Sequence, residues 1–239
     1  MEGQLTVLAL TAASLGFFHT VLGPDHYIPF IAMSKARHWS LIKTFAITFA
    51  CGVGHVLSSV ILGFMGIALG VAVFRLEVLE SARGEIAAWL LLIFGFTYGI
   101  WGLWQALRAK PHQHIHPHSD GVEHSHQHQH TEEHMHVHIH QHTANITPWV
   151  MFTIFVFGPC EPLIPLLMYP AAKGTLNQVV VVVALFSTIT IATMLAIVGL
   201  FFFGLERLNF GKLERYSHAH AIAGFTIFLF AGAIKFLRL

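Results

Sequence analysis

Long apolar stretches separated by short polar segments dominate the pattern of this sequence. About 20 consecutive apolar residues are enough for a helix to cross the roughly 30 Å hydrocarbon core of a membrane. The pattern predicts six such spans, at 5–33, 44–74, 86–107, 148–171, 177–204 and 217–237. The predicted fold class is therefore all-α, a polytopic membrane protein with six transmembrane helices.

Composition supports a membrane protein and excludes several other classes. Only 10% of the 239 residues are charged, whereas soluble domains carry about 25%. Cys51 and Cys160 both lie inside apolar stretches, which argues against a secreted fold held by disulfides. The formal net charge is +1 and no basic patch alternates with aromatic residues, so nucleic acid is not an expected partner.

A histidine-rich segment divides the chain into two parts. Thirteen histidines lie between His112 and His142, many of them alternating with other residues. Because the segment has no apolar periodicity, we expect a disordered loop in the absence of a ligand. Imidazole is a common ligand of divalent transition metals, so the loop is predicted to bind them. The expected units are a first three-helix repeat at 1–109, the loop at 110–146 and a second three-helix repeat at 147–239.

The distribution of Lys and Arg predicts the orientation. In the six-span arrangement, eight of these residues fall on the side of the long loop and five on the other side. Positive charge is enriched on the cytoplasmic side of membrane proteins. We therefore expect a cytoplasmic loop, external termini and a multi-pass location in the inner (plasma) membrane of a bacterial-type cell.

The two halves contain similar short strings in the same order. Residues 23–29 read Gly-Pro-Asp-His-Tyr-Ile-Pro and residues 158–165 read Gly-Pro-Cys-Glu-Pro-Leu-Ile-Pro, while Gly-Phe-Thr occurs at 95–97 and at 224–226. Repeats with an odd number of helices must have opposite orientations in the membrane. Inverted repeats with paired interrupted helices are a recurring transporter plan, with the substrate bound near the interruptions.

Prolines predict where the first helix of each repeat breaks. A proline cannot donate to the carbonyl four residues earlier, so Pro24 leaves the oxygen of Thr20 without a helical partner and Pro159 leaves that of Phe155. In hydrocarbon such carbonyls need a partner, water or an ion. Ordinary proline kinks satisfied by Ser or Thr are the structural alternative, but two kinks at repeat-related positions favour a site.

Ionisable and thiol side chains inside the predicted spans are the candidate metal ligands. Such groups are costly to insert into a membrane and are functional candidates for that reason. The candidates are His19, Asp25, His26, His55, Cys160 and Glu161. Imidazoles combined with carboxylates suit a borderline transition metal better than Mg²⁺ or Ca²⁺. His19 and His26 would be about 10 Å apart along an unbroken helix, and a break at Gly23-Pro24 would bring them closer.

The sequence from His19 to His26 (His-Thr-Val-Leu-Gly-Pro-Asp-His), His55 on the second span and the histidine-rich loop together resemble the nickel/cobalt transporter superfamily. That superfamily includes permeases with an H-x4-D-H motif, six-helix efflux proteins with a histidine-rich loop, and urease-accessory-type membrane proteins. The resemblance implies that His19, Asp25 and His26 select the metal. The spacing here is H-x5-D-H; the Gly-Pro is similar to the efflux branch and the Asp to the uptake branch, which leaves the direction open.

The sequence thus predicts a secondary transporter of Ni²⁺ or Co²⁺ and not an enzyme, with the metal as cargo and no cofactor. No nucleotide-binding motif is present, so we expect an ion gradient or a separate subunit to drive transport. The alternatives are a carrier of Zn²⁺ or another transition metal, a membrane thiol–disulfide electron carrier, and a metal sensor that does not transport. The electron carrier is disfavoured because the two cysteines do not occupy repeat-related positions.

Overall fold

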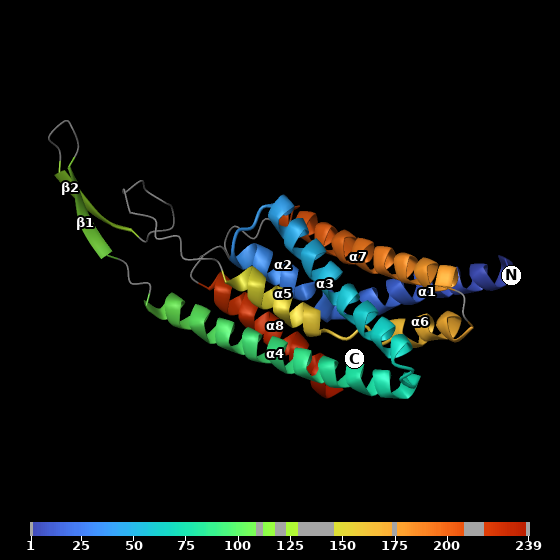
Figure 1. Cartoon of the computed structure of the whole chain (residues 1–239). Coiled ribbons are helices and arrows are strands. Elements are labelled where there is room, and N and C mark those ends of the chain that lie inside the picture. Colours follow the sequence, from blue (N-terminus) through green and yellow to red (C-terminus); the bar gives the residue numbers. More distant parts are fainter. Residues whose placement is uncertain are drawn as a thin grey trace.

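The computed structural model describes residues 2–108, 112–117, 123–128, 146–173, 176–207 and 218–237. The helices are α1 (Glu2–Leu22), the short 3₁₀ helix η1 (Pro24–His26), α2 (Ile28–Ala36), α3 (Leu41–Ala68), α4 (Val73–Arg108), α5 (Thr147–Phe157), α6 (Leu163–Ala172), α7 (Leu176–Arg207) and α8 (Ala219–Leu237). They form an elongated bundle in which α1 and α7 follow one edge and α4 and α8 the other (Figure 1).

Five of these helices, α1, α3, α4, α7 and α8, are long and apolar enough to cross a membrane. Their outer surfaces carry exposed apolar side chains such as Leu10, Phe49, Ile93, Leu200 and Leu229. An apolar exterior of this kind fits lipid rather than water as the surrounding solvent. The chain therefore has the character of a multi-pass membrane protein.

The predicted span 148–171 consists of two helices rather than one. α5 has 11 residues and α6 has 10, and each is too short to cross a membrane alone. The intervening residues Gly158–Pro162 belong to neither helix. The first predicted span is likewise divided, because α1 ends at Leu22 and α2 begins at Ile28. Both interruptions lie at the Gly-Pro dipeptides where the sequence predicts them.

The third long helix begins earlier than the sequence predicts. α4 starts at Val73 instead of residue 86 and has 36 residues. Its first turns carry Arg75, Glu80 and Arg83, which the hydropathy pattern places in a loop. The connection from α3 is a tight turn in which Gly70 has φ of 62°, a conformation that favours glycine. The predicted loop is thus a helix, because Glu80 and Arg83 satisfy each other's charge inside the bundle.

Within the loop predicted to be disordered, the structure has a two-stranded antiparallel hairpin. β1 (His112–Pro117) pairs with β2 (Glu123–His128), with His112 opposite His128 and Pro117 opposite Glu123. The alternating pattern of these residues matches the period of two of a strand. The rest of the predicted loop, residues 109–111, 118–122 and 129–145, lies outside the described part of the chain.

Helices of the first half of the chain pack mainly against helices of the second half. α1 packs against α7, and α5 packs against α3; α2 contacts α8, and α6 contacts α7, α3 and, less extensively, α4. α4 and α8 form the most extensive helix pair, and α3 also contacts α7. The first helical segment of each half therefore lies on the second long helix of the other half.

Glycines allow α4 and α8 to approach one another closely. A Cβ atom on Gly95 would lie 2.5 Å from the backbone nitrogen of Phe228, and one on Gly224 would lie 2.2 Å from the nitrogen of Gly99. The Gly-Phe-Thr strings of the two halves therefore meet at one helix contact. Small residues at such contacts are typical of membrane helix packing.

Polar contacts join four helices on the side of the bundle where α4 ends and the histidine-rich segment follows. Arg37, just after α2, donates to the hydroxyl of Tyr98 on α4 at 3.0 Å and to that of Thr147 on α5 at 2.9 Å. The Tyr98 hydroxyl is 2.7 Å from Nδ1 of His220 on α8. Arg37, in the connection between α2 and α3, therefore helps to hold α4 and α5 together.

Candidate metal site

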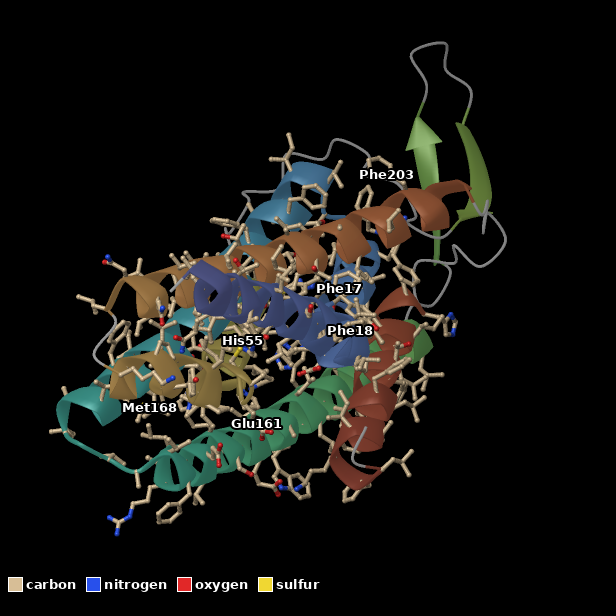
Figure 2. All side chains as sticks on the ribbon, turned by 90° about the vertical axis from the view of Figure 1, so that its right-hand side faces the viewer. Phe17, Phe18, His55, Glu161, Met168 and Phe203 are labelled. Carbon is tan, nitrogen blue, oxygen red and sulfur yellow. The ribbon has the colours of Figure 1, made fainter. Side chains whose placement is uncertain are left out.

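Three imidazoles meet in the middle of the bundle, where both helix breaks face α3. His19 comes from the last turn of α1, His26 from η1 and His55 from α3, and one ligand nitrogen of each lies within 4.8 Å of the others. His26 and His55 are 3% and 2% exposed. Figure 2 shows His55 surrounded by helices. Among the residues that the structure describes, this is the one group of His, Cys, Asp or Glu with metal-binding spacing.

The break after α1 brings His19 and His26 together, as the sequence predicts. Their ring centroids are 4.6 Å apart, well below the about 10 Å expected along an unbroken helix. Gly23 makes this turn possible, because a Cβ atom there would lie 2.5 Å from Nδ1 of His26 and 2.9 Å from the backbone oxygen of His19. Pro24, at the first position of η1, has no N–H with which to continue α1.

Asp25 lies behind His26 rather than among the facing nitrogens. Its Oδ1 is 3.1 Å from Nδ1 of His26, and the carbonyl oxygen of Gly23 is also 3.1 Å from that nitrogen. Because both neighbours are hydrogen-bond acceptors, Nδ1 carries a proton and donates, and in the neutral imidazole Nε2 then carries the lone pair. A carboxylate behind a ligand histidine fixes the ring and makes it a stronger ligand.

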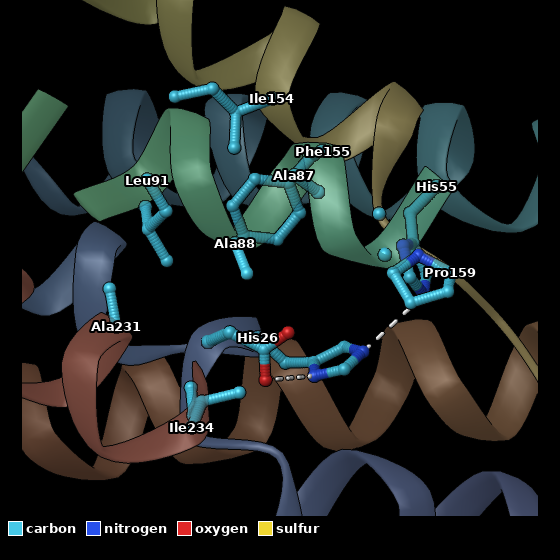
Figure 3. A pocket seen from close by; sticks show the side chains of 13 residues that line it. His26, His55, Ala87, Ala88, Leu91, Ile154, Phe155, Pro159, Ala231 and Ile234 are labelled. Atoms are coloured by element: carbon cyan, nitrogen blue, oxygen red, sulfur yellow. Dashed lines mark hydrogen bonds and ion pairs between the residues drawn. The ribbon is translucent and has the colours of Figure 1, made fainter. Parts of the chain in front are cut away.

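The ring of His55 is held in a similar way from the second break. It hydrogen-bonds to the backbone of Phe155 near the end of α5, and its Nδ1 lies beside Gly158, where a Cβ atom would be 2.9 Å away. Nε2 of His55 therefore faces His26, and the two Nε2 atoms are 3.3 Å apart. Figure 3 shows the His26 ring directed toward His55.

The two Nε2 atoms are within hydrogen-bond distance, so their contact is favourable when a proton or a metal cation lies between them. Two nitrogens bound at about 2.0–2.1 Å to a tetrahedral metal ion are about 3.3–3.4 Å apart. The separation of 3.3 Å between the two Nε2 atoms matches one edge of such a tetrahedron. The His19 ring centroid is 4.6 Å from that of His26 and 6.1 Å from that of His55, so His19 is placed to supply a third nitrogen.

Of the two candidates on the second break, only Cys160 lies beside the histidines. Its Sγ is 3.9 Å from Nε2 of His19, and its side chain is fully buried. Glu161, the next residue, is exposed and does not belong to the histidine group (Figure 2). The structure therefore does not bring the Glu161 carboxylate to the site. Because Glu161 follows Cys160 directly in a non-helical turn, their side chains point in different directions.

The buried acid at the second break is Glu80, which the sequence did not indicate as a site residue. Its carboxylate is 0% exposed, accepts a hydrogen bond from the backbone N–H of Cys160 at 3.1 Å and pairs with Arg83 at 2.6 Å. Charged residues between 75 and 85 made this segment resemble a loop. The opposite charges at positions i and i+3 are the signal that favours a helix here.

A cavity of about 90 Å³ adjoins the histidine pair. Asp25, His26 and His55 lie at one side of it, and apolar residues of α4, α5 and α8, including Ala87, Leu91, Phe155 and Ile234, line the rest (Figure 3). Asp25 is 36% exposed. The site thus has space next to it for a hydrated ion or a water chain.

Comparisons with protein-family models, with curated proteins and with solved structures give no match. The functional argument therefore rests on the residues and geometry of this chain.

Proposed function

We propose that this protein is a secondary transporter that carries a divalent transition metal, Ni²⁺ or Co²⁺, across the membrane. The main support for the proposal is the cluster of His19, His26 and His55, which lies where two interrupted helices meet. His26 and His55 are buried. Metal ligands buried between apolar helices are too costly to be incidental. Transporter sites of this kind lie where helices break near the middle of the membrane.

The architecture proposed is six spans in two inverted three-helix repeats, with α1–α2 and α5–α6 as the broken first span of each repeat. The exchange of helix partners supports this arrangement: α1 lies on α7 as α5 lies on α3, and α2 meets α8 as α6 meets α4. An axis relating the halves would pass near the α3–α7 and α4–α8 contacts. Alternating access then consists of a rocking motion about the site.

The donor set defines the class of cargo. Three imidazoles, with the Cys160 thiol nearby, favour transition metals over Mg²⁺ and Ca²⁺, which prefer oxygen ligands. Asp25 supplies one negative charge that partly offsets the charge of the ion. The metal is cargo, so the site must bind it reversibly.

Zn²⁺ is a second candidate cargo, favoured by one specific distance. The 3.3 Å between the two Nε2 atoms matches a tetrahedral edge, and tetrahedral coordination by nitrogen and sulfur is typical of zinc. Co²⁺ also adopts this geometry readily, whereas Ni²⁺ favours square-planar or octahedral sites.

The proposed location is the inner membrane of a bacterial-type cell, with the histidine-rich segment in the cytoplasm. Thirteen histidines there would collect metal at one face of the membrane. An ion gradient or a separate subunit would supply the energy. The lipid bilayer and the metal ion are the proposed partners.

Flux into proteoliposomes tests the proposal. Purified protein in vesicles containing a metal-sensitive dye should give saturable signals with Co²⁺ or Ni²⁺, weaker or equal signals with Zn²⁺, and none with Mg²⁺. Vesicles without protein are the control, and reversing the metal gradient reports the direction. Tight binding to the detergent-solubilised protein without flux in either direction would make it a sensor rather than a carrier.

Deleting residues 112–142 separates the loop from the site. We expect total bound metal to fall by several ions per chain while flux persists at about half of the parental rate or more, because the three histidines of the cluster stay in place. The measurement is metal content by elemental analysis together with initial flux. A correctly inserted deletion protein with no flux would place the loop on the transport path.

A further inference from the structure

Glu80 and Arg83 on α4 form a buried ion pair that contacts both elements carrying the metal site. Arg83 Nη1 is 2.6 Å from Glu80 Oε1, and the two side chains are 19% and 0% exposed. With Gly84 they lie at positions i, i+3 and i+4, on one face of the helix. A Cβ atom on Gly84 would lie 2.7 Å from Pro159, so this face lies directly against the second break.

The Arg83 guanidinium holds the end of α5. Its Nη2 donates to the carbonyl oxygen of Val156 at 2.8 Å and lies 3.5 Å from that of Gly158. The last carbonyls of a helix have no partner within the helix, and a cation there is favourable. Arg83 thereby satisfies the backbone groups that the helix break exposes inside an apolar bundle.

The same guanidinium reaches α3 next to His55. Nη2 donates to the hydroxyl of Ser58 at 2.6 Å, and that hydroxyl donates to the backbone oxygen of His55 at 2.8 Å. Arg83 is thus connected to the helix turn of His55 and to the end of α5, whose Phe155 backbone holds the His55 ring.

Glu80 completes the arrangement on the other side of the break. Its Oε2 accepts a hydrogen bond from the backbone N–H of Cys160 at 3.1 Å. Cys160 Sγ in turn lies 3.9 Å from Nε2 of His19. The ion pair therefore has one contact toward His55 and another toward the Cys160–His19 side of the site.

We propose that Glu80 and Arg83 are positioning residues that fix the second helix break against the histidine cluster and so set the geometry of the metal site. This inference rests on the proposed function for its consequence in metal affinity, but its structural part is independent of transport. A forked guanidinium is required, because a lysine ammonium cannot bond Glu80, Ser58 and Val156 with the same geometry. The conservative substitution Arg83→Lys therefore disturbs the site while keeping the charge.

Two variants and one control test the proposal in the full-length protein with Cys51→Ser, which leaves Cys160 as the one thiol. The variants are Arg83→Lys and the charge-neutral pair Glu80→Gln with Arg83→Gln. The control is Glu85→Gln on the same helix, which removes an exposed ion pair with Lys235 that does not touch the break. The readouts are the labelling rate of Cys160 by N-ethylmaleimide, Co²⁺ affinity and the visible spectrum of bound Co²⁺.

We expect both variants to increase Cys160 labelling at least about tenfold, to weaken Co²⁺ binding about 10–100-fold and to shift the Co²⁺ ligand-field bands. The control should match the parent in all three readouts. Increased labelling in a protein whose parent binds no Co²⁺ would support the positioning role and remove the proposed function instead. If the double variant aggregates, Arg83→Lys decides: parental labelling, affinity and spectrum in that variant overturn the proposal.

Discussion

Replacing His26 with glutamine should reduce metal flux per inserted molecule by about 100-fold or more. The change keeps a polar side chain but removes the Nε2 lone pair that faces His55 at 3.3 Å. Asp25→Asn should cost about 10–100-fold, the usual range for a residue that orients a metal ligand. The smaller effect follows because the asparagine oxygen can still accept from Nδ1 of His26, whereas the negative charge is lost. The measurement is initial Co²⁺ flux divided by the amount of correctly inserted protein.

His220→Gln is the matched control for this experiment. His220 is a half-buried histidine on α8 that contacts Tyr98 and does not belong to the three-histidine cluster. Its replacement should leave flux within about twofold of the parent. Parental flux from His26→Gln or from Asp25→Asn would remove that residue from the site, and parental flux from both would refute the proposed site.

Replacing Gly224 with alanine should destabilise the bundle by about 3 kcal/mol. The added Cβ would lie 2.2 Å from the backbone nitrogen and 2.4 Å from the Cα of Gly99. Because these are backbone atoms, no side chain can rotate away, and α4 and α8 must separate. Overpacking of a well-packed interior costs about 1–3 kcal/mol, and a clash between two helix backbones belongs at the upper end of that range.

Gly232→Ala is the control for this second prediction. Gly232 lies on the same helix and has no atom within 4 Å of its Cβ position. Alanine there should be neutral or stabilising by up to about 1 kcal/mol, because it favours helix more than glycine does. The measurement is thermal unfolding of each purified variant in the same detergent. Equal melting temperatures for Gly224→Ala and the parent would contradict the close contact of α4 with α8.

The two predictions address different properties of the molecule. The His26 and Asp25 substitutions change a group that binds the proposed cargo or orients that group, so they should lower flux with little effect on unfolding. The glycine substitution changes a helix contact remote from the three imidazoles, so it should lower stability first. Measuring both properties for all five variants separates a binding role from a packing role.

The sequence by itself determined the features that depend on neighbouring residues along the chain. Apolar length predicts the long helices, and the missing N–H groups of Pro24 and Pro159 predict where the helices break. The His19–His26 contact also follows from local geometry, since a break between them shortens their separation.

Only the tertiary structure decided which polar groups meet. Asp25 was predicted as a ligand, but it lies behind His26, and its place depends on how the Gly23 turn folds. Glu161 was predicted at the site and is exposed, whereas Glu80, distant in sequence from Cys160, is the acid buried at that break. A hydropathy pattern predicts that a charged residue faces solvent. It contains no information about Arg83 and the N–H of Cys160, which compensate the charge of Glu80 in the folded protein. A charge becomes stable inside the bundle only through partners that folding supplies from other helices.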